Sequence, residues 1–359
     1  MRVLYSFAEG GEDVKRWRLL QAVSVFMGSV LGAGFVSGQE LYLFFGRFGV
    51  FGVCGLLLSM LLLSLFFYML LRCLARDPLK KPCLPECRAL SYLGEGIELS
   101  FLFVIDLIMA AGVGALFEGV LGGTLARVLG ALVFCAAVAF LICLGTTQVL
   151  RYFALVTPLL VLLAIGISVF VLLRGGWPTL SREFSFAFFP NALSYASYGF
   201  LGALGMFCAL GRRINDRRTA SLGAILGGVL LLLCAGAILF ALLSSPAARN
   251  AELPMLAVAE RVHPVLYYAY AWLLLVAMLG AALSVASPLF ERLGELCRIR
   301  TVKGRVPLAA GLSLLVFGLS LFGFADLVGV LYPLYGYIGF LFLAFLLYNY
   351  LRGLCRAKR

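Results

Sequence analysis

A glycine-rich run in the first long apolar stretch has the composition of a binding site. It reads Gly28-Ser-Val-Leu-Gly32-Ala-Gly34-Phe-Val-Ser37-Gly38-Gln39-Glu40. Each glycine costs a helix interior roughly 1 kcal/mol relative to alanine, so the run predicts an unwound break at membrane depth. In such a break, free carbonyl groups can hold a cation, and a new helix N-terminus can hold a substrate carboxylate. Close helix packing through small residues is the alternative, but it does not require the polar end of the run. The expected substrate contacts are Ser29, Gly32, Gly34, Ser37 and Gly38.

A second hydroxyl-rich run lies in the stretch 189–211. Its hydroxyl groups gather beside a glycine, and buried hydroxyls in lipid need a partner on a neighbouring helix or on a substrate. Packing alone explains this run about as well, but its place in the second half of the chain matches that of the first run. We therefore expect a second interrupted helix here. The expected substrate contacts are Tyr195, Ser197, Tyr198 and Gly199.

Acidic residues inside apolar stretches are candidates for coupling an ion to transport. Removal from water generally raises the pKa of a carboxyl group, so such a residue could carry a proton. A carboxylate fixed by neighbouring hydroxyls, or facing water at a helix end, is the alternative. The stretch 264–292 adds two hydroxyls. The candidates for ion coupling are Glu40, Asp106, Glu118, Ser284 and Ser287.

We expect no catalytic residue, metal or other cofactor. Cys83 and Cys87 lie close together, but a structural zinc needs four ligands and the only histidine, His263, is far away. An enzyme is therefore disfavoured. We expect His263 to be a surface loop residue.

The high hydrophobic content shows which kind of secondary structure holds these residues. Hydrophobic residues make up 63% of the 359 positions, against about 45–50% in soluble domains, and the mean hydropathy is +1.05. Backbone polar groups have no water partners in lipid, so the long apolar stretches must be helices. The sequence thus predicts an all-α membrane protein with ten transmembrane helices, at about 19–45, 49–73, 97–123, 126–144, 149–173, 189–211, 219–243, 264–292, 305–323 and 325–351.

The distribution of Lys and Arg gives the orientation. With the N-terminus inside, the inner segments hold 23 of the 29 basic residues and the outer segments hold six. Basic residues in cytoplasmic loops are typical of membrane proteins, so both termini are expected in the cytoplasm. A net charge of +12 could suggest binding to nucleic acid. The basic residues are spread over short loops instead, which argues against a nucleic-acid partner. The expected parts are a cytoplasmic segment 1–18, one transmembrane domain 19–351 and a cytoplasmic tail 352–359.

The transmembrane domain has the marks of an internal repeat, with halves at about 19–173 and 189–351. Arg151 precedes Thr157-Pro158-Leu159 by the same spacing that separates Asp326 from Tyr332-Pro333-Leu334. Five helices in each half would give the halves opposite topology, an inverted repeat. Chance is the alternative, since proline is common in membrane helices.

These motifs resemble those of the YkvI-like family of bacterial amino acid permeases. The similar segments are Gly32-Ala-Gly34-Phe35-Val36-Ser37-Gly38-Gln39-Glu40, Tyr195-Ala-Ser197-Tyr198, Ala111-Gly112-Val-Gly114-Ala-Leu-Phe117-Glu118 and Leu253-Pro254-Met255-Leu256. The resemblance implies the amino acid–polyamine–organocation superfamily and its LeuT-like 5+5 fold. LeuT-like sodium transporters carry adjacent hydroxyls on the eighth helix, whereas here Leu283 precedes Ser284. This difference favours protons, or exchange without a coupling ion, over sodium. No lysine lies at 149–173, where some proton-coupled members carry one.

The expected function is therefore secondary transport of a small solute, an amino acid or related amine, by alternating access. A channel or a membrane sensor on a transporter fold remains the alternative. The expected location is the cell membrane of a bacterium.

A short helix over about 252–262 would lie over the outer vestibule, either as a gate or as an inert interfacial helix. The sequence leaves open the solute, the coupling ion, the direction of transport and the oligomeric state.

Overall fold

The computed structural model describes residues 11–77, 82–85, 88–143, 146–178, 180–211, 214, 216–245, 251–299 and 302–357. Over these residues the chain forms helices and no strand. The helices are α1 (Gly11–Val30), α2 (Ala33–Ser37), α3 (Gln39–Phe44), the 3-10 turn η2 (Gly46–Phe48), α4 (Gly49–Arg76), α5 (Arg88–Leu121), α6 (Thr124–Ile142), α7 (Thr146–Gly175), α8 (Phe188–Gly211), α9 (Arg217–Leu243), α10 (Pro254–Val262), α11 (Pro264–Leu296), α12 (Val302–Leu319) and α13 (Phe324–Ala357). The predicted all-α fold is confirmed.

The predicted segments correspond closely to these helices. The first segment, 19–45, is divided among α1, α2 and α3, and each of the other nine corresponds to one helix. Within the described residues, eight helices are long and apolar enough to cross a membrane, and Gly304–Leu319 is a shorter apolar helix. The count of ten spans stays a prediction, because the interrupted first segment and the short ninth lie outside those eight.

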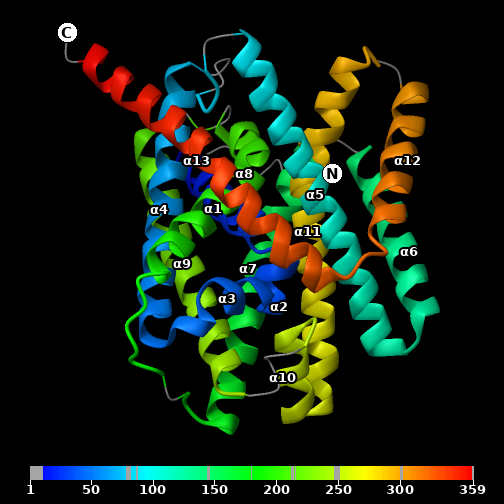
Figure 1. The fold of residues 1–359 in the computed structure, drawn as a ribbon. Helices are drawn as coiled ribbons and strands as arrows, with labels where there is room; N and C mark the ends of the chain where they lie inside the picture. The colour runs from blue at the N-terminus through cyan, green and yellow to red at the C-terminus, as the bar shows by residue number, and fades with distance from the viewer. Residues whose placement is uncertain are drawn as a thin grey trace.

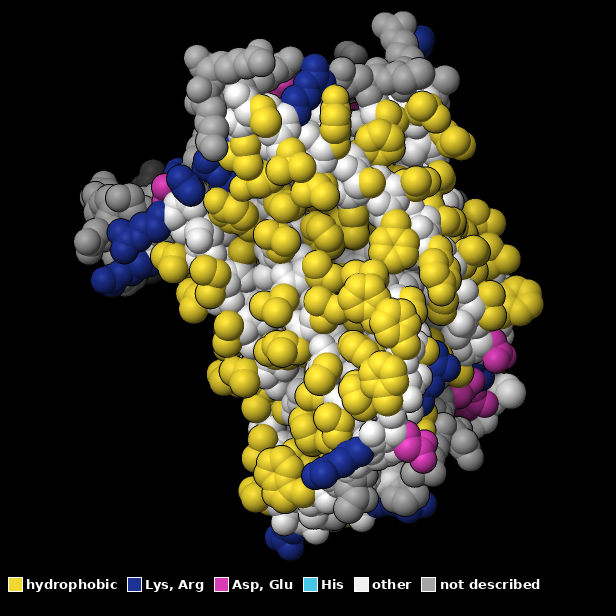
Figure 2. All heavy atoms as spheres, turned by 60° about the vertical axis from the view of Figure 1, so that its left-hand side comes forward, with side chains coloured by type: hydrophobic (Ala, Val, Ile, Leu, Met, Phe, Trp, Pro, Cys, Tyr) yellow, Lys and Arg dark blue, Asp and Glu magenta, His cyan; other side chains and the backbone are white. Residues whose placement is uncertain are grey.

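The helices form a bundle with an apolar outer surface, as a membrane protein requires (Figures 1 and 2). Figure 2 shows a broad apolar face with charged side chains gathered toward its ends. Leu61 on α4 and Leu233 on α9 are more than half exposed on this outer surface. In water such surface would be unfavourable, but against lipid tails it costs nothing.

The predicted interruption of the first segment is confirmed. Regular hydrogen bonding stops at Gly32, whose amide donates to Val30 O at 2.8 Å instead of to the carbonyl four residues back. The helical turn α2 follows, and Gly38 then takes a left-handed conformation with φ 82° before α3 begins. Residues other than glycine rarely adopt this conformation, so Gly38 sets the second bend.

The predicted interruption of the second hydroxyl-rich run is wrong, because α8 is continuous from Phe188 to Gly211. Its glycines recur every third residue and allow neighbouring helices to approach. A Cβ at Gly202 would lie 2.6 Å from Ile105 of α5, and one at Gly205 would lie 2.6 Å from Pro288 of α11. Close packing against α5 and α11 therefore offsets the helix-breaking tendency of these glycines. Here the small residues serve helix packing and not an unwound binding site.

The last helix of each half packs on the first helix of that half. In the first half, α7 packs on α1, where a Cβ at Gly28 would lie 2.6 Å from Thr157 Oγ1. In the second half, α13 packs on α8, where a Cβ at Gly336 would lie 2.9 Å from Ser194 O. This matched packing agrees with an inverted repeat, which stays a prediction.

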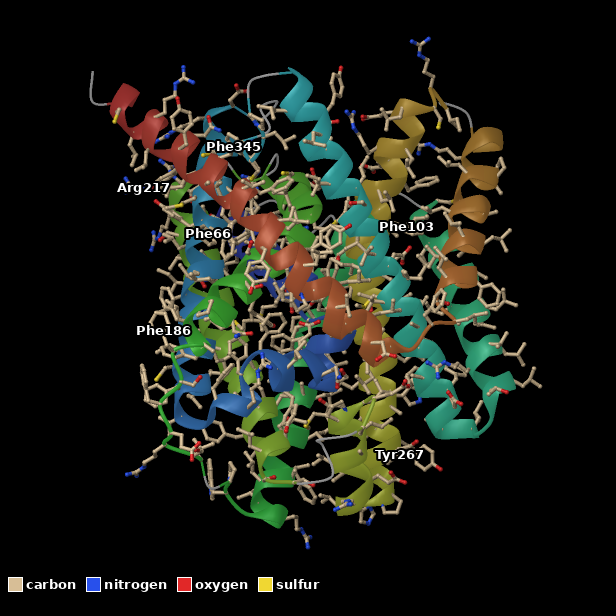
Figure 3. The ribbon with its side chains drawn as sticks, viewed as in Figure 1. Phe66, Phe103, Phe186, Arg217, Tyr267 and Phe345 are labelled. Carbon is tan, nitrogen blue, oxygen red and sulfur yellow. The ribbon has the colours of Figure 1, made fainter. Side chains whose placement is uncertain are left out.

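The two ends of the bundle carry the segments that the Lys and Arg distribution assigns to opposite sides of the membrane. The start of α5 and the ends of α11 and α13 lie at the upper end in Figure 1, whereas α10 lies at the lower end. Figure 3 shows Arg217 toward the upper end and Tyr267 toward the lower end. We refer to these as the inner and outer ends, following the predicted orientation.

This orientation predicts where single cysteines can be labelled from outside the cell. We expect a cysteine at position 85 or 215 to be labelled only after the membrane is opened, because both positions belong to inner loops. Position 85 lies after α4, and position 215 falls outside the described residues. Impermeant maleimide labelling of intact cells in a cysteine-free background measures this. Labelling of either position in intact cells would contradict the orientation.

Candidate functional site: a central cavity beside the broken helix

A small cavity lies where the broken first segment meets α5, α8, α11 and α13. About 30 Å³ of it is open to water-sized spheres, and one water needs roughly 10–15 Å³ by this measure. The cavity therefore has room for a small cationic group or one or two waters, not for a whole amino acid. It is lined by Ser29, Val30, Gly32, Glu40, Ile105, Met109, Tyr195, Tyr198, Gly199, Gly202, Ala281, Ser284, Val285 and Tyr332.

The bends of the first segment bring Glu40 to this cavity. Val36 N donates to Gly32 O at 3.0 Å and closes the single turn of α2. Tyr270 of α11 donates from its hydroxyl to Val36 O at 2.6 Å, which holds the end of that turn. The left-handed Gly38 then redirects the chain so that Glu40, in the first turn of α3, is buried at 4% exposure.

Tyrosine hydroxyls surround the Glu40 carboxylate. The Tyr198 hydroxyl donates a short hydrogen bond to Glu40 Oε2, and the Tyr332 hydroxyl lies within hydrogen-bonding reach of the same carboxylate. On the other side, a Cβ at Gly34 would lie 2.6 Å from Glu40 Cδ, so only glycine leaves room for the carboxylate in this position. Neither lysine, arginine nor histidine is among the cavity-lining residues of the described chain.

Aromatic rings wall the cavity near the end of α3. The rings of Tyr198 and Tyr332 stack with centroids 4.7 Å apart, and Phe44 stacks on Tyr198 at 5.4 Å. Tyr195 packs edge-on against Phe44, also at 5.4 Å. These ring contacts fix the position of Tyr198, whose hydroxyl reaches Glu40.

Two buried hydroxyl groups of the cavity have no hydrogen-bond partner in the part of the chain that the structure describes. Ser29 Oγ makes no hydrogen bond among the described residues. The Tyr195 hydroxyl, in a side chain only 1% exposed, lies near Tyr198 but makes no hydrogen bond of ordinary length and angle there. Buried polar atoms are normally satisfied, so both oxygens point to a ligand or to water in this space.

Comparisons with known proteins agree with the motifs and the fold. No family model matches the chain. The uncharacterized membrane protein YkvI of Bacillus subtilis strain 168 is 26% identical over 340 residues, covering 91% of this chain and 94% of that protein. The chain thus resembles YkvI along nearly its whole length. The uncharacterized protein YyaD of the same organism is 24% identical over 344 residues, covering 93% of this chain and 96% of that protein.

A solved structure supports the expected fold of this YkvI-like chain. MhsT in complex with L-phenylalanine matches with a TM-score of 0.68 at 17% identity, over 92% of this chain and 91% of that chain. The predicted LeuT-like fold is therefore confirmed. A likeness at this level of identity concerns the fold alone.

The YkvI-like chain gathers half of the predicted site residues at the cavity. These are Ser29, Gly32, Glu40, Tyr195, Tyr198, Gly199 and Ser284. Six of them come from the glycine-rich and hydroxyl-rich runs, of which only the first is interrupted, and Ser284 comes from α11. Their roles in binding stay predictions.

The remaining predicted substrate contacts support the backbone instead of lining the cavity. Ser37 donates to Gly34 O at 3.2 Å and accepts from Gln39 N at 3.3 Å, so it stabilises the bend at Gly38. The Ser197 hydroxyl lies against Gly339 of α13. Small and hydroxylated residues are used for backbone packing as readily as for ligands, and composition does not separate the two uses.

Three predicted coupling residues also lie elsewhere. Glu118 is salt-bridged to Arg127 at 2.9 Å near the outer end of α5, so its charge is compensated without a coupling ion. Asp106 is buried at 4% exposure on α5, beside Cys135 of α6. Ser287 is buried on α11, one turn beyond the cavity-lining Ser284. Coupling through Asp106 and Ser287 stays a prediction.

Sequence reasoning missed several cavity residues. Tyr332 contacts the Glu40 carboxylate and stacks on Tyr198. A signal for it existed, because Tyr332 precedes the intramembrane proline used to align the two halves. Ile105 and Met109 carry no such signal, since apolar side chains on a membrane helix are expected on every face.

A larger cavity of about 220 Å³ opens at the inner end of the bundle. It is lined by Leu74, Pro82, Cys83, Leu84, Glu95, Glu98, Leu99, Leu102, Leu204, Gly205, Cys208, Ala209, Pro288, Glu291, Arg292 and Glu295. Arg292 is salt-bridged to Glu95 and, at 2.7 Å, to Glu295. Burial raises the pKa of the Cys83 thiol well above its ordinary range, which disfavours the thiolate that a metal would need. Cys87 lies outside the described residues.

The contact between Gly34 and Glu40 gives a prediction that separates activity from stability. In Gly34→Ala the new methyl group must displace the Glu40 carboxylate, which sits at the end of a flexible side chain. We therefore expect the variant to fold with a melting temperature near that of the wild type but to lose most solute binding. Gly166→Ala on α7 is the matched control, because a Cβ there meets no atom within 4 Å. Unchanged binding in Gly34→Ala would show that the position of the carboxylate is unimportant.

Proposed function

We propose that this chain is a secondary transporter of a small solute, an amino acid or related amine. The observation that carries the proposal is the buried carboxylate of Glu40 in a hydroxyl-lined cavity at the break of the first segment, within a LeuT-like fold. A packed protein core has no need of a carboxylate and unpaired hydroxyls in a cavity, so a binding role accounts for them best.

The arrangement of the two cavities supports alternating access. On three helices the lining of the inner cavity begins two or three residues beyond that of the central one. Toward the inner end, Leu102 follows Ile105 on α5, Leu204 follows Gly202 on α8, and Pro288 follows Val285 on α11. Three residues of helix span about 4.5 Å. Less than one helical turn therefore separates the linings of the two cavities on these helices, so a small displacement of the helices could join them.

Protons are the coupling ion that we propose. Within the described residues no basic side chain lines the cavity, so the charge of Glu40 must be compensated by a group that arrives from solution. A proton or a cationic solute group can do this in turn. Asp106 is proposed as a second carboxylate in the coupling.

The proposed location is the plasma membrane of a bacterium, with both termini in the cytoplasm.

An uptake screen tests the proposed function. Purified protein in proteoliposomes is given radiolabelled amino acids and small amines, with and without Na⁺ and with pH gradients of either sign. We expect accumulation of at least one solute above protein-free vesicles, dependent on the pH gradient and indifferent to Na⁺. Accumulation that requires Na⁺ would refute proton coupling, and no accumulation of any solute would refute transport.

A further inference from the structure

We infer that the Glu40 carboxylate holds a primary ammonium group of the solute directly. This inference rests on the proposed function and narrows it, because it identifies which part of the solute the central cavity recognises. Recognition would thus depend on the ammonium group, while a carboxylate on the solute would be dispensable at this site.

The inventory of donors and acceptors around the cavity supports an ammonium group. Every polar side chain that lines the cavity is a carboxylate or a hydroxyl: Ser29, Glu40, Tyr195, Tyr198, Ser284 and Tyr332. A primary ammonium has three donors and no acceptor. Glu40 supplies charge, and the unpartnered oxygens of Ser29 and Tyr195 supply two further acceptors.

The size of the cavity and the charge of its lining agree with the same group. The cavity of about 30 Å³ has room for an ammonium group but not for a side chain. The absence of any basic side chain among the described lining residues makes an anionic ligand unfavourable.

Sodium is the other cation that such oxygens could bind, and the hydrogen bonds favour ammonium over it. The hydroxyls of Tyr198 and Tyr332 donate hydrogen bonds to Glu40, so some lone pairs of the carboxylate oxygens are already occupied. The Ser284 hydroxyl donates to Ala281 O at 2.7 Å. An ammonium needs only three acceptors, whereas a bare metal ion needs a fuller shell of oxygens.

Binding of small probes to the purified full-length protein tests the inference. The probe is ¹³C-labelled methylammonium, observed by saturation-transfer NMR in potassium chloride and again in sodium chloride of equal ionic strength. We expect a dissociation constant of about a few millimolar, since a ligand of two heavy atoms binds no tighter. Tetramethylammonium, which lacks N–H donors, and acetate are expected to bind much more weakly.

Variants assign the binding to the cavity. Glu40→Gln is expected to weaken methylammonium binding by roughly tenfold or more, and Tyr195→Phe by a smaller factor, because hydrogen bonds to charged groups are strong. Glu183→Gln removes an exposed carboxylate and is expected to leave binding unchanged. Melting temperatures within a few degrees of the wild type show that the variants fold.

Each outcome bears on either the inference or the proposed function. Equal binding of acetate, methylammonium binding that survives both substitutions, or a Glu40-dependent site that binds sodium instead would overturn the inference. Uptake of a solute without an amino group would overturn it too, yet leave transport intact. Glu40-dependent methylammonium binding without uptake of any solute would support the inference and refute the proposed function.

Discussion

Replacing Glu40 by glutamine is expected to abolish accumulation driven by a pH gradient. Glutamine keeps the size of the side chain but removes the charge and the site of proton exchange. Glu40 is 4% exposed, and Tyr198 donates to it. Loss of a charge-assisted contact of this kind corresponds to about a tenfold to hundredfold loss of affinity. Initial uptake rates in proteoliposomes with an imposed pH gradient measure the effect.

Two further variants separate the loss of a surface charge and the loss of coupling from the effect at Glu40. Glu183→Gln removes an exposed carboxylate and should leave uptake unchanged. Asp106→Asn should lower pH-driven accumulation but leave solute binding intact, because Asp106 is buried on α5 without lining the cavity. Uptake by Glu40→Gln at the wild-type rate, with the same dependence on pH, would exclude Glu40 from the coupling.

Gly336→Ala is expected to destabilise the fold. A Cβ at Gly336 would lie 2.9 Å from Ser194 O, a backbone atom of α8 that cannot swing away. The helices α8 and α13 would have to separate, and overpacking of this kind costs about 1–3 kcal/mol. A larger side chain, as in Gly336→Leu, should prevent folding. Thermal denaturation in detergent, followed by tryptophan fluorescence, should show a melting temperature lower by several degrees.

Gly329 on the same helix gives the matched control. A Cβ there meets no atom within 4 Å, so Gly329→Ala brings the better helix propensity of alanine without a clash. We expect its melting temperature to equal or exceed that of the wild type. If Gly336→Ala were as stable as Gly329→Ala, the close approach of α8 and α13 would not contribute to stability.

The fold could be predicted largely because lipid leaves the chain few choices. Apolar stretches must be helical there, so their lengths and the basic loops located nearly every helix. The break at Gly32 was also predictable, since glycines at Gly28, Gly32, Gly34 and Gly38 leave little helix propensity. The same reasoning failed for α8, because whether Gly202 breaks a helix or receives a neighbour depends on Ile105, which is distant in the sequence.

The site was predictable to the extent that its residues carry a polar signal. Glu40, Tyr195 and Tyr198 stand out in an apolar sequence, and they meet at one cavity. Ser197 stands out equally but packs on Gly339, because the direction of a helical side chain depends on the position of the neighbouring helix. Met109 lines the cavity without any signal, since it resembles every other apolar residue of the span.

Uptake by purified protein in proteoliposomes decides whether the chain is a proton-coupled transporter. A radiolabelled amine or amino acid from the screen is presented under a pH gradient without Na⁺, to vesicles with wild-type protein, with Glu40→Gln and without protein. We expect accumulation only with the wild type, abolished when a protonophore collapses the gradient. Equal accumulation in wild-type and protein-free vesicles, for every solute tested, would contradict this expectation.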